Sequence, residues 1–351
     1  MHPIRPLQLA LALTLIWNTA QAQTAATASA PQAAPAAPAK ASLLERTAPS
    51  VDTLPDDEYG RLARYGHELA TRTFAYLGPE VKDKKMRYTG NNLACTSCHQ
   101  ENATKPFAMP WVGVTATFPQ YRGREDAVST VEERVNGCME RSMNGKPLPI
   151  ASHEMKAFVT YIHFLSKGIP VGAQVEGSGT KTIPAPNRRA DVAAGEAVFK
   201  EKCVACHGED GAGKRNGVKG DAQGYLFPAV WGPDSFNNGA GLNRLLTTMR
   251  FLKQNMPQGA NHKATVLSDD EAYDVAAYVV SKPRPTKAHL DRDFPARWNK
   301  PIDAPFPPYV DGAPADQHKY GPFQPLADKA RKIAAEHAEQ VKAKKSAPSA
   351  K

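Results

Sequence analysis

The chain has 351 residues and a formal net charge of +9, so it is long enough for two ordinary domains and is basic overall. Only 41% of its residues are hydrophobic and 30 are prolines, which excludes a membrane-embedded protein and predicts long irregular stretches. Beyond the N-terminus, no apolar stretch is long enough to span a bilayer. We also expect no nucleic-acid partner.

The N-terminal residues have the order of a secretory signal peptide. Arg5 is followed by an apolar run over residues 7–17 and by an A-x-A sequence at 20–22. The run is short for a membrane span, so a cleaved signal over 1–22 is preferred to a retained anchor. This predicts a periplasmic protein with no transmembrane anchor after cleavage.

Both ends of the mature chain are compositionally biased. Residues 23–45 are rich in Ala and Pro and predict a disordered leader. Residues 326–351 form a basic tail of good helix formers with a weak apolar face. We expect this tail to be mobile. A solvated charged end is favoured over a contact with membrane phosphates or an acidic partner.

Two C-x-x-C-H motifs carry the clearest chemical signal. In this motif two thiols add to the vinyl groups of a porphyrin, and the histidine ligates the iron. A zinc site would need further ligands at matched spacings, and a redox dithiol would not need the histidine. The sequence therefore predicts two covalently attached c-type haems. The residues concerned are Cys95, Cys98 and His99, and Cys203, Cys206 and His207.

The flanks of the two motifs repeat one plan, in which a helix precedes each motif and another follows it. The expected helices are Tyr59–Leu77 and Ser152–Lys167 around the first motif, and Asp191–Lys200 and Glu271–Ser281 around the second. This order resembles the mono-haem cytochrome c domain. We expect a mainly α fold with two cytochrome c-like haem domains in tandem and long irregular loops. The domains are predicted at 46–172 and 189–285, with a linker at 173–188 and an extended Pro-rich segment at 286–325.

A low-spin haem needs a second axial ligand besides its histidine. In the second domain Met256 is the best candidate, because it lies between the motif and the last helix and Pro257 stiffens its loop. Met249, Lys253 and His262 are nearby competitors.

In the first domain the equivalent window holds Met109, Cys138, Met139 and Met143. A spare thiol is a liability in an oxidising compartment, because it can form unwanted disulfides. Cys138 could be a buried inert residue or pair with a partner protein. The third interpretation, which its position favours, is that its thiolate is the sixth ligand of the first haem. A thiolate would lower the potential of that haem.

Basic residues crowd the region of Cys138, and they are Arg122, Arg124, Arg134, Arg141 and Lys146. If 134–142 is helical, Arg134, Cys138 and Ser142 share one face, although Asn136-Gly137 weakens that helix. Guanidinium groups bind anionic oxygens bidentately, so this patch suits a small oxyanion. The alternative is a solvated surface or ion pairs with Glu132, Glu133 and Glu140.

Together these segments resemble the di-haem thiosulfate dehydrogenases of the bacterial periplasm. The resemblance rests on residues 92–99, 134–142, 255–257 and the proline-rich 303–323. It implies that two thiosulfates are coupled to tetrathionate with release of two electrons, or the reverse. It also implies His99 and Cys138 as ligands of an active-site haem, and His207 and Met256 as ligands of an electron-exit haem. By the same resemblance, Arg124, Arg134 and Ser142 lie near the substrate.

Two departures from other family members affect electron transfer. Some members have a lysine where this chain has Asn255, and that lysine ligates the second iron in one redox state, so we expect no ligand switching by that route. Some members are fused to a further di-haem acceptor, whereas two motifs here imply a separate acceptor protein. A further hypothesis is that Cys138 leaves the iron and bonds transiently to a substrate sulfur.

Two other functions compete with this enzyme. One is a di-haem electron carrier without its own substrate, which would need neither a thiolate nor an arginine cluster. The other is the cysteine-ligated haem subunit of a sulfur-oxidising complex, which the C-terminal segment disfavours.

Overall fold

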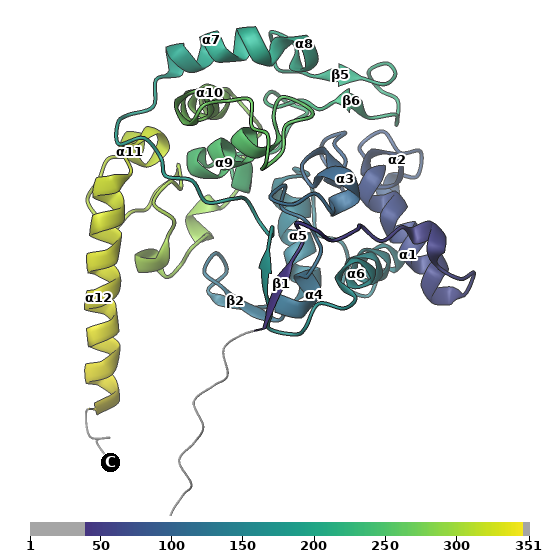
Figure 1. The fold of residues 1–351 in the computed structure, drawn as a ribbon, viewed down its shortest axis with the longest axis horizontal. Coiled ribbons are helices and arrows are strands. Elements are labelled where there is room, and N and C mark those ends of the chain that lie inside the picture. Colours follow the sequence, from purple (N-terminus) through teal and green to yellow (C-terminus); the bar gives the residue numbers. More distant parts are fainter. Residues whose placement is uncertain (1–38, 347–351) are drawn as a thin grey trace, which may run out of the picture. The chain divides into compact units, whose positions relative to one another are not determined.

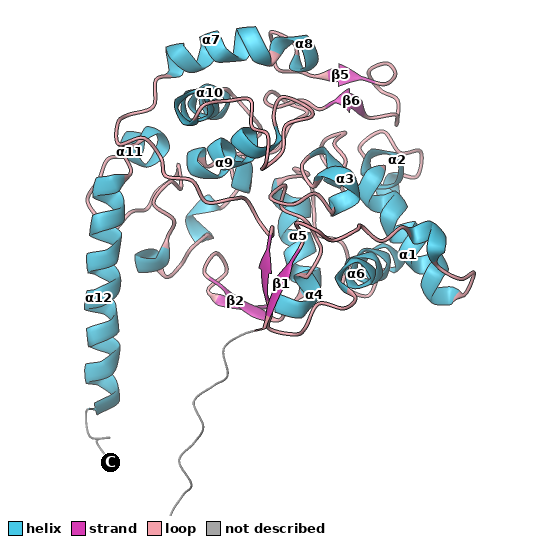
Figure 2. Ribbon diagram, in the orientation of Figure 1, coloured by secondary structure: helices cyan, strands magenta, loops and turns pink. Residues whose placement is uncertain are grey.

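The computed structural model describes residues 39–346, and this part of the chain is mainly helical (Figures 1 and 2). The first half contains β1 (Lys40–Ser42), α1 (Glu58–Thr71), α2 (Thr73–Leu77), α3 (Gln100–Ala103), α4 (Val114–Thr117), β2 (Gln120–Arg122), β3 (Ala127–Ser129), α5 (Val131–Arg141), α6 (His153–Ser166) and β4 (Gln174–Glu176). The second half contains α7 (Val192–Lys202), α8 (Val204–His207), β5 (Lys214–Arg215), β6 (Tyr225–Phe227), α9 (Leu245–Asn255) and α10 (Asp269–Ser281). The C-terminal part contains α11 (Ala315–Tyr320) and α12 (Gln324–Ser346).

Residues 1–38 and 347–351 lie outside the described residues, and with them the predicted signal peptide, most of the leader and the end of the tail. None of the helices within 39–346 combines the length and the apolar character that a membrane span requires.

The two halves repeat one arrangement, as expected for tandem cytochrome c domains. In each half the first long helix crosses the last one, α1 against α6 and α7 against α10. Each crossing lies in a hydrophobic core of its own. The capping box predicted at Ser268 and Glu271 is present and starts α10, while Asp191 and Ser152 cap α7 and α6.

The prediction of one helix over Tyr59–Leu77 is wrong in detail, because the chain breaks at Arg72. Thr73 restarts the helix as α2 and turns its hydroxyl back to the Leu69 carbonyl at 2.6 Å. The same hydroxyl accepts a hydrogen bond from the Cys95 backbone N–H at 3.1 Å. The break therefore connects this helix to the first haem motif, a long-range contact that local helix propensity does not encode.

The boundaries of the irregular segments also differ from the prediction. Lys40–Ser42 pair in parallel with Gln174–Glu176, so the predicted leader is ordered at its end and the predicted linker begins with a strand. Backbone pairing between segments this far apart leaves no trace in local composition.

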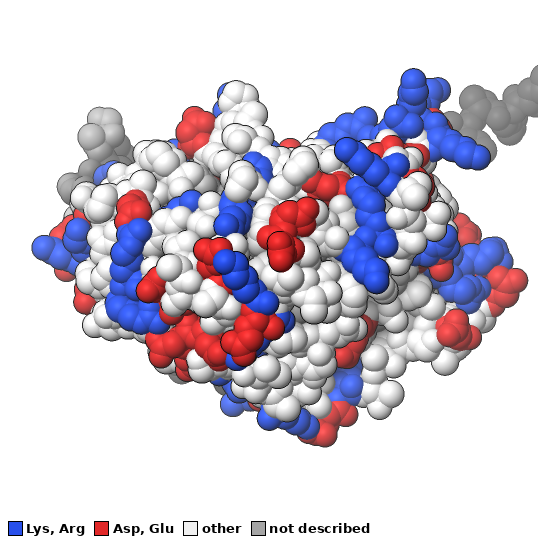
Figure 3. Space-filling model, turned by 90° about the horizontal axis from the view of Figure 1, so that it is seen from above, with Lys and Arg blue, Asp and Glu red and all other residues white. Residues whose placement is uncertain are grey.

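The C-terminal part is irregular only in its first section. Short 3-10 helices at Leu290–Arg292 and Arg297–Asn299 and the helix α11 interrupt the predicted extended segment. The predicted tail is helical, as α12, and it begins two residues before residue 326. Leu326 joins the second core, and Trp298 stacks on His337 with ring centroids 4.2 Å apart. Figure 3 shows Lys and Arg side chains interspersed with Asp and Glu on one face, so that face carries no single patch of positive charge.

A glycine stands at each helix crossing. A Cβ on Gly66 would overlap the Ala157 carbonyl oxygen, and a Cβ on Gly195 would overlap the Asp274 carbonyl oxygen. The backbones of the crossing helices therefore touch at these points, and no larger residue fits without separating them.

We predict that Gly195→Ala lowers the free energy of unfolding by about 1–3 kcal/mol, because overpacking at the crossing outweighs the better helix propensity of alanine. Thermal or denaturant unfolding of the haem-loaded protein measures this change. Ala197→Ser adds one atom on the exposed side of the same helix and should cost about 0.5 kcal/mol or less. Equal stability of Gly195→Ala and the parent protein would contradict the close contact.

Candidate functional site: two haem cavities and an arginine-lined pocket

The first C-x-x-C-H motif lines a cavity of about 340 Å³ that Cys95, Cys98 and His99 share with one face of α5. The His99 Nδ1 atom lies 2.5 Å from the Met109 carbonyl oxygen. A carbonyl can only accept, so Nδ1 carries the proton and donates it. The other ring nitrogen is then unprotonated and available as an iron ligand.

The second motif repeats this arrangement. Cys203, Cys206 and His207 line a cavity of about 700 Å³, and His207 Nδ1 lies 2.9 Å from the Pro228 carbonyl oxygen. Burial lowers the pKa of His207, which keeps its imidazole neutral. In both halves the two thiols and an oriented histidine face one cavity, which is the donor set that a c-type haem requires. Within residues 39–346 no group of three or more His, Cys, Asp and Glu side chains is arranged to hold a metal ion.

Met256 is the methionine that lines the second cavity, directly after α9. The three competitors lie elsewhere. Met249 is fully buried in the second core, Lys253 donates to the Leu267 carbonyl at 2.5 Å, and the His262 ring packs on Phe107 with centroids 5.3 Å apart. The geometry therefore favours Met256 among the four candidates.

The odd cysteine, Cys138, lies in the middle of α5. This helix forms despite Asn136-Gly137, since Thr130 and Glu133 make a capping box at its start and Asn136 bonds the Leu148 backbone in both directions. The Cys138 side chain lines the same cavity as His99. Met109, Met139 and Met143 also line this cavity, although Met139 and Met143 belong to the first core.

Arg134, one helical turn before Cys138, places Nη1 2.7 Å from the Cys138 sulfur. Burial raises the pKa of the thiol, but the adjacent Arg134 charge opposes this effect, and the pKa of Cys138 is lowered to about 6. Arg134 therefore favours the thiolate form of the sulfur. The Cys138 side chain is half-buried, because it lines the cavity.

The predicted anion-binding residues meet at this cavity. Arg124, Arg134 and Ser142 all line it, together with Arg122 and Arg141. Ser142 follows α5 as its C-cap, so Arg134, Cys138 and Ser142 do share one face. The alternative of simple surface ion pairs applies in part: the Arg141 guanidinium lies 3.6 Å from the Glu140 carboxylate. Within residues 39–346 neither Glu132 nor Glu133 makes an ion pair.

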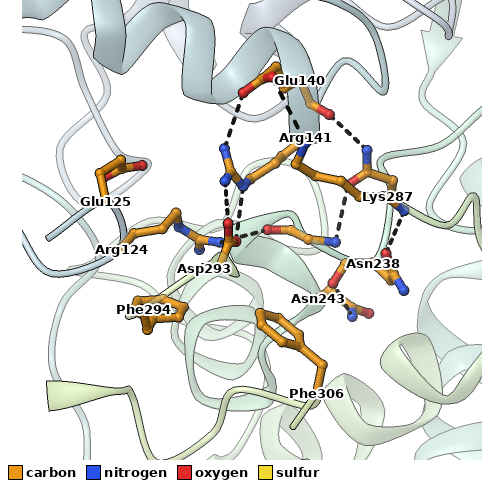
Figure 4. Close-up of polar contacts among 12 residues, drawn as sticks. Arg124, Glu125, Glu140, Arg141, Asn238, Asn243, Lys287, Asp293, Phe294 and Phe306 are labelled. Atoms are coloured by element: carbon orange, nitrogen blue, oxygen red, sulfur yellow. Dashed lines mark hydrogen bonds and ion pairs between the residues drawn. The ribbon is translucent and has the colours of Figure 1, made fainter. Parts of the chain in front are cut away.

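Sequence reasoning missed Asp293, which belongs to the C-terminal segment and is 5% exposed. Its carboxylate accepts hydrogen bonds from Arg124 Nη1 at 2.5 Å and from Arg141 Nη2 at 2.6 Å (Figure 4). Its neighbour Phe294 lies under the Arg124 guanidinium, 4.8 Å from Cζ to the ring centroid. No local pattern marks Asp293, because its partners lie more than 150 residues away in the chain.

The two cavities lie on either side of the first haem motif. Ala94 lines both, Cys95 and Cys98 line the first, and Thr96 and Ser97 line the second. This short segment thus separates the two cavities.

The Asp234 carboxylate connects this segment to the second half of the protein. Asp234 accepts from the Asn92 backbone N–H at 2.9 Å, from Arg215 at 2.5 Å and from the Tyr225 hydroxyl at 2.5 Å. The contact fixes the first motif relative to β6 and the loop that carries Asp234.

The fold and these two sites define a di-haem c-type cytochrome. Residues 85–171 match the family model described as SoxA/TsdA, cytochrome c domain, and residues 192–282 match the one described as Cytochrome c. The two helix-crossing halves therefore correspond to two established domain families. The chain carries two c-type haems.

Similar proteins identify the family within this class of cytochromes. Thiosulfate dehydrogenase from Psychrobacter arcticus is 41% identical over 70% of this chain and 71% of its own length, and that from Allochromatium vinosum is 42% identical over 68% and 84%. A solved structure of thiosulfate dehydrogenase (TsdBA) from Marichromatium purpuratum is similar with a TM-score of 0.62 and 32% identity over 70% of this chain. This chain covers 51% of that one, about half its length. The chain belongs to the thiosulfate dehydrogenase family.

We predict that Met256→His lowers the reduction potential of one of the two haems and leaves the other unchanged, because methionine ligation raises the potential relative to histidine. A spectroscopic redox titration measures both potentials. Met249→Leu is the control: it alters a core methionine and should change stability but neither potential. Unchanged potentials in Met256→His would exclude Met256 as a ligand.

Proposed function

We propose that this protein oxidises two thiosulfates to tetrathionate with release of two electrons, or runs the reverse reaction, and that it does so in the periplasm. The observation that carries the proposal is the Cys138 thiol, which shares a cavity with His99 and several arginines and lies 2.7 Å from Arg134 Nη1. Membership of the thiosulfate dehydrogenase family supports the same activity.

The residues that would hold the haems are Cys95 and Cys98 with His99 and Cys138 as iron ligands, and Cys203 and Cys206 with His207 and Met256. When bound, the two haems would accept the two electrons that the reaction releases. A thiolate ligand would lower the potential of the first site and a methionine ligand would raise that of the second, which would direct electrons outward. A separate redox protein then accepts them. Asn255 donates to the Phe251 and Phe107 carbonyls and takes no part as a ligand.

The main task of the chain's own residues is to bring two dianions together. Thiosulfate carries two negative charges, so the approach of a second one to the first is repulsive. Arg124 and Arg134 line the cavity and provide positive charge that stabilises the paired anions. Ser142 adds a hydroxyl donor on the same face of α5.

Cys138 takes part in bond formation in this proposal. Its thiolate bonds to the terminal sulfur of one thiosulfate, and two electrons are released. The terminal sulfur of the second thiosulfate then attacks that same sulfur atom. The sulfur–sulfur bond of tetrathionate forms, and Cys138 departs as a thiolate without any proton transfer. Arg134, 2.7 Å from the sulfur, stabilises the thiolate at the start and the end of this sequence.

The second candidate function is a di-haem electron carrier without its own substrate. An electron carrier does not need a cysteine–arginine pair, because a second methionine could serve as the iron ligand of the first site. Substitution of Cys138 separates the two functions.

We predict that Cys138→Ala lowers turnover by about 100-fold or more, because it removes both the ligand and the nucleophile. Anaerobic assays with thiosulfate and an artificial acceptor, and with tetrathionate and a reduced donor, measure it against covalent haem content. Cys138→Met keeps a sulfur ligand but no nucleophile, so full turnover in that variant would rule out the covalent step. A parent protein that is inactive in both directions would exclude the enzyme.

A further inference from the structure

Four separate parts of the chain meet at Arg124 and Arg141, which line the first cavity (Figure 4). Arg124 comes from the loop between β2 and β3, and Arg141 ends α5. The Gly239 carbonyl, from the second half of the protein, accepts from Arg124 Nη1 at 3.2 Å. Asp293 and Phe294 come from the C-terminal segment. None of these parts could place the two arginines alone.

Asp293 is the point at which they meet. Its Oδ2 atom accepts from Arg124 Nη1 at 2.5 Å and from Arg141 Nε at 3.3 Å, and its Oδ1 atom accepts from Arg141 Nη2 at 2.6 Å. The three side chains are only 14%, 11% and 7% exposed for Arg124, Arg141 and Asp293. One buried carboxylate therefore sets the separation and orientation of two guanidinium groups.

The backbone strengthens this arrangement. The Phe294 N–H donates to the Arg124 carbonyl at 2.8 Å, while the Phe294 ring covers the Arg124 guanidinium. The 3-10 helix at Leu290–Arg292 leads directly into Asp293, and Arg297 Nη1 donates to the Asp293 and Phe294 carbonyls at 2.6 and 2.8 Å. The backbone that carries the Asp293 carboxylate is therefore held in place as well.

Arg124 keeps donors for a ligand. Within residues 39–346 its Nε and Nη2 atoms donate to no acceptor, although the side chain lines the cavity. Burial and the nearby Arg141 charge lower the pKa of Arg124 to about 10, so it still carries its charge at neutral pH. Two adjacent guanidinium groups repel each other, and the carboxylate between them offsets that repulsion.

We propose that Asp293 is a positioning residue of the substrate site: it holds Arg124 and Arg141 in the arrangement that receives the thiosulfate dianions beside Cys138. The inference rests on the proposed function. Asp293 acts through the two arginines and makes no contact with the substrate. It also gives the C-terminal segment a role in anion binding, although that segment follows both cytochrome domains in the chain.

The competing explanation is that Asp293 only ties the C-terminal segment to the rest of the protein. The chain offers a matched control for this. Asp303 belongs to the same segment, is 0% exposed and accepts from Arg244 Nε at 2.8 Å and from the Leu246 N–H at 3.1 Å. Arg244 is not among the residues that line the first cavity. Asp303→Asn therefore removes a comparable ion pair without changing the contacts of an arginine that lines the cavity.

The test compares the haem-loaded parent, Asp293→Asn and Asp303→Asn proteins in two measurements. One is steady-state thiosulfate oxidation with an artificial acceptor. The other is calorimetric binding of tetrathionate to the oxidised proteins in a Cys138→Ser background without a donor, so that no thiolate can attack the ligand and no turnover occurs. For Asp293→Asn we expect the KM for thiosulfate and the Kd for tetrathionate to rise about tenfold, with kcat within about twofold. For Asp303→Asn we expect both constants within about twofold of the parent.

A merely structural role gives a different pattern. It lowers the fraction of active protein, so kcat falls while KM and Kd stay constant. That result, or an equal rise of both constants in the two variants, would overturn the inference. If Asp293→Asn yields no haem-loaded protein, Asp293→Glu moves the charge by one methylene and should raise KM and Kd several-fold at unchanged thermal stability. Unchanged constants in that variant would also overturn it. Inactivity of the parent protein, in contrast, would contradict the proposed function itself.

Discussion

The contact of two backbones at a glycine is the constraint on which each half of this protein depends. Gly66 lets α1 touch α6, and Gly195 lets α7 touch α10. These crossings build the two cores, and the loops between the crossing helices are then long enough to surround a haem. Because the same crossing occurs twice, the histidine of each half is also oriented in the same way, by a hydrogen bond from Nδ1 to a backbone carbonyl. The two halves differ in the candidate second ligand that lines each cavity.

That difference is a matter of charge. The cavity that His207 lines is also lined by the neutral Met256, whereas the cavity that His99 lines is also lined by Cys138, whose thiolate form Arg134 stabilises. Buried charges are costly unless they are paired, and the first cavity pairs its own. Arg134 is matched by Cys138, and Arg124 and Arg141 share Asp293. The remaining guanidinium donors point to a ligand that is itself anionic. In the proposed function, the same fold therefore serves for electron transfer in the second half and for chemistry on an anion in the first.

Much of this could be predicted from local sequence. The haem motifs, the helices α6, α7 and α10 and the shared face of Arg134, Cys138 and Ser142 follow from short spacings. The predictions that were wrong depend on partners far along the chain. The break at Arg72 follows from a contact with Cys95, and the order of residues 40–42 follows from pairing with residues 174–176. Asp293 was missed for the same reason, since one acidic residue in a proline-rich segment has no pattern of its own.

The sequence by itself determined covalent haem attachment and the pairing of Arg134 with Cys138, because both depend on residue types at spacings of a few positions. It also limited the choice of ligand for the second haem to four candidates, from which the fold separates Met256 by burying or engaging the other three. Only the tertiary structure decided how the arginines are held and what separates the two cavities. Both depend on segments that meet only after folding: Asp293 reaches Arg124 across 169 residues, and Asp234 reaches Asn92 across 142. A buried ion pair is specified by three-dimensional proximity, which no local pattern contains.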